Sequence, residues 1–519
     1  MALNSLKRNL AHARMAHTAL KLRRADDEQL RERARQHLVN QMGKMRGLPQ
    51  KLGQMLSFSL EDNTGDDETD EGQNAYARLQ ESAEPLPLGT AVAELEKAWG
   101  KPVETVLQSI EPSEHTGSLG QVHRAVTLDG RYVAIKVRYP GIRGAVMTDL
   151  KTLGWLSAPM GSLRRGFDLS SYRQVILNNL ECELDYRLEA ECLRDFGSWT
   201  ANEQNLVVPT VVEELTTEEV LVSSWEEGET WQDVRRNWST QEKRQAVAHL
   251  LHFFLRGLFR EGQIQADWHP GNFRFRRQGG DVQIVALDLG CVFEPSEEER
   301  LSLARLIQAT IHGNESPWPL FLKLGFNREY LEPLADKLPA LCRTLFEPFC
   351  VDHPYDLADW KLGERVGDIL ASDRLNFRIA GPANLVFLMR AFHGLAFYAQ
   401  SFESPVRWQS VFEKCVEPLA VKMAQLPLPR EEAASDFGSL SKHLKIRVTD
   451  NGREKVALTS RAGSIEYLQE TLPAEILEKI HQRQIDLEAI VADVRRRAYA
   501  PGPVFDLQDG DKQIQVSLE

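Results

Sequence analysis

The sequence predicts an α+β protein in which a small, mainly antiparallel sheet precedes a larger helical region. Short alternating strands separated by turns fill residues 106–228, and from Thr240 onward the pattern is mostly helical apart from a hairpin around Asp281. The chain has 519 residues. That length exceeds one ordinary core, so about two to four subdomains of roughly 100 to 200 residues are expected.

The composition is that of a globular protein with sizeable cores. Hydrophobic residues make up 42% of the chain and charged residues 26%, which argues against global disorder. The net charge of -13 argues against nucleic acid as the main partner. The six cysteines include no C-x-x-C pair, so we expect reduced thiols in a reducing, cytoplasmic compartment. No run reaches the ~18 apolar residues that cross a bilayer, so at most peripheral membrane contact is expected.

Residues 1–105 are predicted to form a helical extension with an acidic linker. The acidic run at 61–72 is predicted to be a solvated loop. The basic first two dozen residues fit an ordinary helix better than a targeting element, because no apolar segment or cleavage site follows them. Apolar residues recur upstream at helical spacing, at Leu30, Ala34, Leu38 and Met42.

Residues 106–228 are predicted to form a lobe built on an antiparallel sheet that carries one important helix. Asp129-Gly130 is a hairpin signal between two strands. The predicted order is a glycine turn at 117–120, strands at 121–127 and 132–137, a helix at 170–199, and strands at 207–212 and 219–225.

The remaining chain is predicted to form a helical lobe and a small final module. The helical lobe spans 229–425 and contains the hairpin around Asp281. In residues 440–500, alternating apolar residues flank Asp450-Asn451-Gly452, which predicts a β-hairpin followed by a helix. Residues 501–519 are expected to be a tail.

The segment from Ile264 to Gly290 carries the residue pattern of phosphoryl transfer. Asp267 and Asn272 stand five apart, the spacing at which one side chain orients the nucleophile and the other holds Mg²⁺ in protein kinases. An apolar strand then leads to Asp288-Leu289-Gly290, where a second metal-binding Asp is expected. Taken alone, Asp267 could simply cap a turn before Pro270.

A glycine turn and a buried lysine precede this segment. Gly117-Ser118-Leu119-Gly120 with Val122 matches the second half of a kinase glycine-rich loop, although an ordinary hairpin turn explains it equally well in isolation. Lys136 follows Ala134 in an apolar strand, where an ammonium group needs a negative partner unless it reaches solvent from an edge strand. Glu189 is the preferred partner, although the acidic helix around it could be a solvated face.

The order and spacing of these features together favour a bilobal, protein-kinase-like fold. Several further stretches make the chain resemble the UbiB/AarF atypical kinase-like family. The residues that carry this resemblance are Lys51-x-Gly53-Gln54, Gln121-Val-His123, Val137 to Gly141, Glu183-x-Asp185 with Tyr186, Pro270-Gly-Asn272 and Asp288-x-Gly290. The resemblance covers roughly residues 43–420.

The resemblance implies an atypical kinase or ATPase that uses ATP, or alternatively ADP, with Mg²⁺. It implies that Lys136 and Glu189 form an ion pair and that Asp267 is the catalytic Asp. It further implies that Asn272 and Asp288 bind the metal. The residues implied to border the nucleotide are Lys51, Gln54, Gly117, Ser118, Leu119, Gly120, Val122, Ala134, Lys136, Glu183 and Asp185.

The same family is associated with ubiquinone and other isoprenoid lipids. The implied partners are therefore a nucleotide, a lipid or isoprenoid-quinone precursor, and the enzymes that synthesise it. Two other interpretations stay open: a nucleotide-switched scaffold that phosphorylates nothing, and a small-molecule kinase of the aminoglycoside type. This chain departs from the family pattern at Thr116-Gly117, at Gln265 where His is common, and at Trp268 where Pro is usual.

Overall fold

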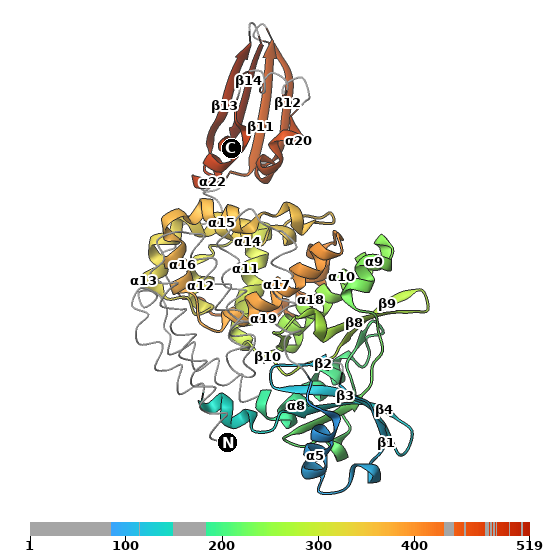
Figure 1. The fold of residues 1–519 in the computed structure, drawn as a ribbon. Coiled ribbons are helices and arrows are strands. Elements are labelled where there is room, and N and C mark those ends of the chain that lie inside the picture. Colours follow the sequence, from blue (N-terminus) through green and yellow to red (C-terminus); the bar gives the residue numbers. More distant parts are fainter. Residues whose placement is uncertain are drawn as a thin grey trace, which may run out of the picture. The chain divides into compact units, whose positions relative to one another are not determined.

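The computed structural model divides the chain into two compact units (Figure 1). The first contains the described residues up to Trp238 together with Gln265–Val292, and the second contains Ser239–Ile264 and Phe293–Glu519. The predicted extension with Lys51 and Gln54 lies outside the described residues. Those residues are 85–113, 115–148, 183–429, 441–450, 453–472, 477, 480, 483, 485–497, 499–509 and 512–519.

The first unit is built on a five-stranded antiparallel sheet with strand order β1-β3-β4-β6, in which β2 pairs with β3. Alternating burial along β3 and β4 confirms the predicted period of two, and Gly130 turns the chain between them with φ of +86°. The strands are β1 (Leu107–Ile110), β2 (His115–Thr116), β3 (Gly120–Thr127), β4 (Tyr132–Arg138) and β6 (Val220–Ser224).

The two faces of this sheet have different partners. One face packs its apolar side chains with those of α5 (Leu88–Trp99), including Leu95, Val133 and Ile135. The other face carries Lys136, whose side chain reaches α8 (Tyr186–Thr200). Because successive side chains alternate across a strand, the apolar core and the polar site are built from the same strand, β4.

A second, three-stranded sheet carries the segment that contains Asp267, Asn272 and Asp288. β9 (Asp281–Ala286) pairs in parallel with β5 (Leu206–Val207) and antiparallel with β8 (Phe273–Gln278). The predicted hairpin between β8 and β9 is present, and Gly279 and Gly280 form its turn with φ of +61° and +90°. The sequence predicts this segment within the helical lobe at 229–425, whereas the structure pairs β9 with β5 and includes Gln265–Val292 in the first unit.

The second unit is mostly helical. Capping boxes at Ser239 and Ser296 begin two of its long helices. The helices are α10 (Thr240–Arg256), α11 (Glu297–His312), α12 (Trp318–Lys323), α13 (Arg328–Leu331), α14 (Leu338–Leu345), α15 (Leu362–Leu370), α16 (Arg374–Ala380), α17 (Leu385–Ser401), α18 (Trp408–Val416) and α19 (Ala420–Gln425). The separate short helix α9 (Trp231–Asn237) belongs to the first unit.

The C-terminal part of the second unit contains a four-stranded sheet with order β12-β11-β14-β13. The predicted hairpin forms β11 (His443–Asp450) and β12 (Arg453–Arg461), and a 3₁₀ helix, η13 (Ala462–Tyr467), follows it. The helices α20 (Leu468–Thr471) and α22 (Leu487–Arg496) complete this part of the chain.

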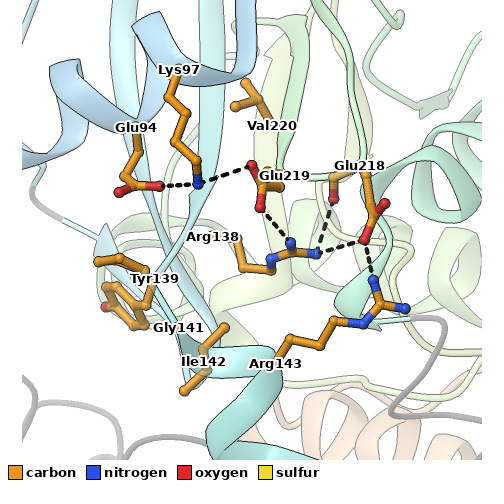
Figure 2. A pocket seen from close by; sticks show the side chains of 11 residues that line it. Glu94, Lys97, Arg138, Tyr139, Gly141, Ile142, Arg143, Glu218, Glu219 and Val220 are labelled. Carbon is orange, nitrogen blue, oxygen red and sulfur yellow. Dashed lines mark hydrogen bonds and ion pairs between the residues drawn. The ribbon is translucent and has the colours of Figure 1, made fainter. Parts of the chain in front are cut away.

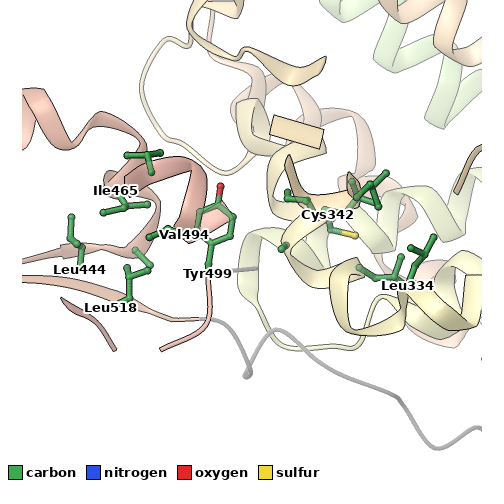
Figure 3. Packing of buried hydrophobic residues seen from close by; sticks show 14 of the residues in the cluster. Leu334, Cys342, Leu444, Ile465, Val494, Tyr499 and Leu518 are labelled. Atoms are coloured by element: carbon green, nitrogen blue, oxygen red, sulfur yellow. The ribbon is translucent and has the colours of Figure 1, made fainter. Parts of the chain in front are cut away.

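The expectation of a tail at 501–519 was wrong. These residues form β13 (Gly502–Asp509) and β14 (Lys512–Leu518). The physical reason is alternation in β14: Ile514, Val516 and Leu518 are buried and pair with the apolar residues of β11. Figure 3 shows Leu518 beside Leu444 and Val494 in this core.

Candidate active site

The predicted lysine lies between two carboxylates. The Nζ atom of Lys136 donates to both carboxylate oxygens of Glu189 at 2.8 Å and to Oδ2 of Asp288 at 3.0 Å. The side chain of Glu189 is only 2% exposed, whereas that of Lys136 is 24% exposed. The ammonium group of Lys136 therefore connects the sheet with α8 through Glu189 and with the D-x-G loop through Asp288.

Burial and mutual charge set the protonation of these groups. Burial alone lowers the pKa of Lys136, but the carboxylates of Asp288 and Glu189 outweigh it and raise that pKa well above its ordinary value. For Asp288, burial opposes ionisation, but Lys136 and the N–H of Gly290 lower its pKa. Burial raises the pKa of Glu189 to about 7, against the effect of Lys136.

The raised pKa of Glu189 predicts opposite responses of turnover and stability to pH. As the pH falls from about 8 to about 6, protonated Glu189 releases Lys136, so nucleotide turnover should fall with a midpoint near the pKa of about 7. The folded chain binds this proton more tightly than the unfolded chain. As the pH falls over the same interval, Glu189 should therefore raise the free energy of unfolding. Profiles of kcat/KM and of Tm against pH would test both signs. A Glu189→Gln protein that loses turnover with the same midpoint would contradict the assignment.

The glycine turn packs against both the sheet and α8. The N–H of Gly117 donates to the carbonyl oxygen of Gly120 at 2.8 Å, which closes the turn. A Cβ atom on Gly120 would lie 2.5 Å from the carbonyl oxygen of Val137 and 2.5 Å from the hydroxyl of Tyr186. Glycine is therefore required at position 120 by close approach of two neighbours.

The other predicted nucleotide contacts are distributed around this turn. Leu119 points its side chain into an apolar cluster with Tyr139, Ile142 and Leu184, so only its backbone is available to a phosphate. Val122 and Ala134 lie on the face of the sheet that carries Lys136. Ser118 lies at the tip of the turn between β2 and β3.

The predicted E-x-D residues lie at the beginning of α8. Asp185 is the N-cap of this helix and accepts a hydrogen bond from the N–H of Arg187 at 3.1 Å. Its carboxylate also pairs with the guanidinium group of Arg187 at 2.8 Å, and that contact lowers the pKa of Asp185. The negative charge of Glu183 makes a small contribution to the raised pKa of Glu189.

The loop that contains Asp267 and Asn272 is joined to the D-x-G loop through the backbone. The side-chain N–H of Asn272 donates to the carbonyl oxygen of Asp267 at 2.9 Å, and the N–H of Leu287 donates to the carbonyl oxygen of Asn272 at 2.8 Å. These contacts place Asn272 next to the residue before Asp288. An amide oxygen and a carboxylate suit Mg²⁺, which usually takes few protein ligands and completes its shell with phosphates and water. The donor set therefore fits the predicted metal.

Gln265 connects the two loops through its side chain. Its carbonyl oxygen accepts from the N–H of Asp267 at 3.1 Å, and its amide nitrogen donates to the carbonyl oxygen of Asp288. The indole N–H of Trp268 donates to the backbone carbonyl oxygen of Gln265 at 2.6 Å, and the Trp268 ring packs on Phe273. The sequence marked Gln265 and Trp268 only as departures from a pattern, because their contacts depend on loops that meet in space.

Replacing Gln265 by Glu should lower nucleotide turnover by about tenfold or more, since a carboxylate cannot donate to the Asp288 carbonyl and a buried acceptor stays unsatisfied. As the pH is lowered and the new carboxyl group becomes protonated, kcat/KM of the variant should rise relative to that of the wild-type chain at the same pH, although both fall in absolute terms when Glu189 is protonated. Measurement of kcat/KM against pH would test this expectation. The same change at exposed Gln278 is the matched control, and equal loss in both proteins would contradict a linking role.

The chain is similar to known atypical kinases. A family model described as the ABC1 atypical kinase-like domain matches residues 78–317. The mitochondrial atypical kinase COQ8B of Rattus norvegicus is 26% identical over 407 residues, which cover 77% of this chain and 75% of that protein. The mitochondrial atypical kinase COQ8 of Saccharomyces cerevisiae is 25% identical over 384 residues, or 73% of this chain and 75% of that protein.

A solved structure agrees with these relatives. The complex of Rv3197 with erythromycin from Mycobacterium tuberculosis is 26% identical to this chain, with a TM-score of 0.52, and covers 75% of this chain and 97% of that one. The helices within the described ranges are all too short or too polar to span a bilayer. The predicted resemblance to the UbiB/AarF family is confirmed, because residues 78–317 match the ABC1 atypical kinase-like domain and the relatives named above are atypical kinases.

Proposed function

We propose that this chain binds Mg-ATP and transfers or hydrolyses its γ-phosphate as an atypical kinase or ATPase. The observation that carries this proposal is the contact of Lys136 with Glu189 at 2.8 Å and with Asp288 at 3.0 Å. A largely buried ammonium group held between two carboxylates, beside a glycine turn, is suited to receive nucleotide phosphates.

Each residue has a distinct role in this proposal. Lys136, oriented by Glu189, pairs with the α- and β-phosphates, and the backbone of Gly117–Gly120 approaches the phosphate chain. Asn272 and Asp288 would hold Mg²⁺, which when bound neutralises charge on the phosphates. Asp267 orients the attacking hydroxyl group or water. Phosphoryl transfer asks the protein mainly for this positioning and charge balance.

We further propose that this activity supports isoprenoid-quinone or related lipid metabolism. The proposal rests on the family resemblance and on relatives named as mitochondrial atypical kinases COQ8 and COQ8B. The acceptor would then be a lipid precursor or a biosynthetic enzyme that handles one, reached from the cytoplasmic, inner face of a membrane. Lys51 and Gln54 would cover the nucleotide and restrict access of protein substrates.

Nucleotide affinity and phosphate release, measured together, test the proposed activity. We expect ATP to bind in the presence of Mg²⁺ and more weakly in EDTA, with phosphate release that responds to anionic liposomes. Binding without release, under any added lipid or phenol, would instead support a nucleotide-switched scaffold. Transfer to a small-molecule acceptor would support a small-molecule kinase. The absence of nucleotide binding would contradict the proposal.

A further inference from the structure

We propose that Arg138 is a positioning residue that holds the N-terminal end of α8 where Glu189 can meet Lys136. Lys136 and Arg138 are two residues apart on β4, so both side chains leave the same face of the sheet. Lys136 reaches the first turn of α8, and Arg138 reaches the backbone just before that helix. The consequence for turnover rests on the proposed function, whereas the effect on the helix does not.

Arg138 lies at the centre of a charged cavity of about 390 Å³ (Figure 2). The charged groups that line it are Glu94, Lys97, Arg138, Arg143, Glu218 and Glu219. Figure 2 shows these side chains paired with one another across the cavity. Glu219 accepts from Arg138 at 2.9 Å and lies 3.7 Å from the Nζ atom of Lys97, while Glu218 pairs with Arg143. Because the charged side chains that line the cavity pair with one another, we interpret the cavity as a contact between three segments of the chain and not as a ligand-binding site.

The planar guanidinium group of Arg138 contacts three acceptors in different directions, which the single ammonium group of a lysine could not reach together. It donates to the carbonyl oxygen of Leu184, to the carbonyl oxygen of Glu218 at 3.3 Å, and to the Glu219 carboxylate at 2.9 Å. The side chain is only 7% exposed. Buried donors that lose their acceptors are costly, so these contacts favour one arrangement of the three segments.

The same acceptors fix the start of α8. The carbonyl oxygen of Glu218 also accepts from the N–H of Tyr186, the first residue of the helix, at 3.1 Å. The Glu218 carboxylate lies 3.3 Å from Arg187, which pairs with the N-cap Asp185. Displacement of α8 from the sheet would break the contacts of Tyr186 and Arg187 with Glu218 and would remove the Leu184 carbonyl oxygen from the buried guanidinium group of Arg138. Arg138 therefore ties the helix that carries Glu189 to the strand that carries Lys136.

The decisive experiment is a double-mutant cycle of Arg138→Met and Glu189→Gln, read by kcat and KM for Mg-ATP hydrolysis. Arg138→Met should lower kcat/KM by about tenfold or more when Glu189 is present, the effect of losing hydrogen bonds to a charged group. In the Glu189→Gln background it should change kcat/KM by less than about twofold, because its effect passes through Glu189. Arg138→Lys keeps the positive charge but lacks the several N–H donors of the guanidinium group, so it should restore little of the kcat/KM lost in Arg138→Met.

Amide hydrogen exchange at Tyr186 and Arg187 supplies a readout that needs no nucleotide. We expect exchange to speed up by about tenfold or more in Arg138→Met or Arg138→Lys. Lys97→Met is the matched control, since Lys97 lies on the same cavity and is 63% exposed. Unchanged exchange, or equal losses of kcat/KM in both Glu189 backgrounds, would overturn the positioning role. Faster exchange in a chain that binds no nucleotide would overturn the proposed function alone.

Discussion

Replacing Asp288 by Asn is expected to remove almost all magnesium-dependent ATP turnover. The substitution keeps the size of the side chain but removes the negative charge that would hold the metal and that lies 3.0 Å from Lys136. The loop should stay in place, because Oδ1 of residue 288 can still accept from the N–H of Gly290, now at 2.8 Å. We expect kcat/KM to fall by at least about 10²-fold, the effect of losing one preorganised charge contact in the transition state.

The matched control for Asp288→Asn is Asp281→Asn at the opposite end of β9. Asp281 is exposed beside the hairpin turn, so its substitution should leave turnover within about twofold of wild type. Turnover should be measured with saturating Mg²⁺ and with EDTA, and folding should be compared by Tm. Full magnesium-dependent activity in a folded Asp288→Asn protein would show that the D-x-G loop does not carry the metal.

Replacing Glu466 by Ala is expected to cost about 3–5 kcal/mol in the free energy of unfolding of the second unit. The Glu466 carboxylate accepts from Arg495 at 2.8 Å and from the Tyr499 hydroxyl, and it lies 3.6 Å from Nε of Arg365. The side chains of Glu466 and Arg365 are 6% and 4% exposed. Removal of Glu466 leaves two buried guanidinium groups with too few acceptors, which is more damaging than removal of a whole network.

Chemical denaturation with probes in both parts of the second unit would measure this cost. Arg365 lies in α15 and Glu466 lies in η13. The network therefore joins the helices to the part of the chain that contains the C-terminal sheet. Glu364→Ala is the control: Glu364 also contacts Arg495, at 3.3 Å, but it is 61% exposed and should cost less than about 1 kcal/mol. A Glu466→Ala loss no larger than the Glu364→Ala loss would contradict the prediction.

The sequence could predict those parts of the site for which the residue types and their order along the chain indicate the chemistry. Lys136 had to meet an acid because it interrupts an apolar strand, and Glu189 on the acidic helix was the preferred partner. Asp288 was expected only as a metal ligand, and its contact with Lys136 emerges from the structure. The Asp129-Gly130 and Gly279-Gly280 turns were predictable because local backbone conformation determines them.

Other contacts depend on distant segments and could not be predicted. Arg138 contacts Glu219, which lies 81 positions later in the chain. Nothing in the sequence distinguishes either residue from the charged residues that usually lie on a protein surface. Gln265 gains its role only because the carbonyl group of Asp288 arrives beside its amide. Glu466 gains its buried ion pairs only because Arg365, 101 positions earlier, and Arg495, 29 positions later, arrive beside it.

The return of the chain to the first unit at Gln265 has a consequence for synthesis of the protein on the ribosome. Lys136 and Glu189 are 53 positions apart, but Lys136 and Asp288 are 152 positions apart. At about 5–20 residues per second, roughly 8–30 s separate the emergence of Lys136 from that of Asp288. Glu189 emerges after the first 53 of these 152 positions, and for the remaining positions it is the carboxylate of this trio that can neutralise Lys136. The nascent sheet therefore depends on α8 before the segment that contains Asp288 is synthesised.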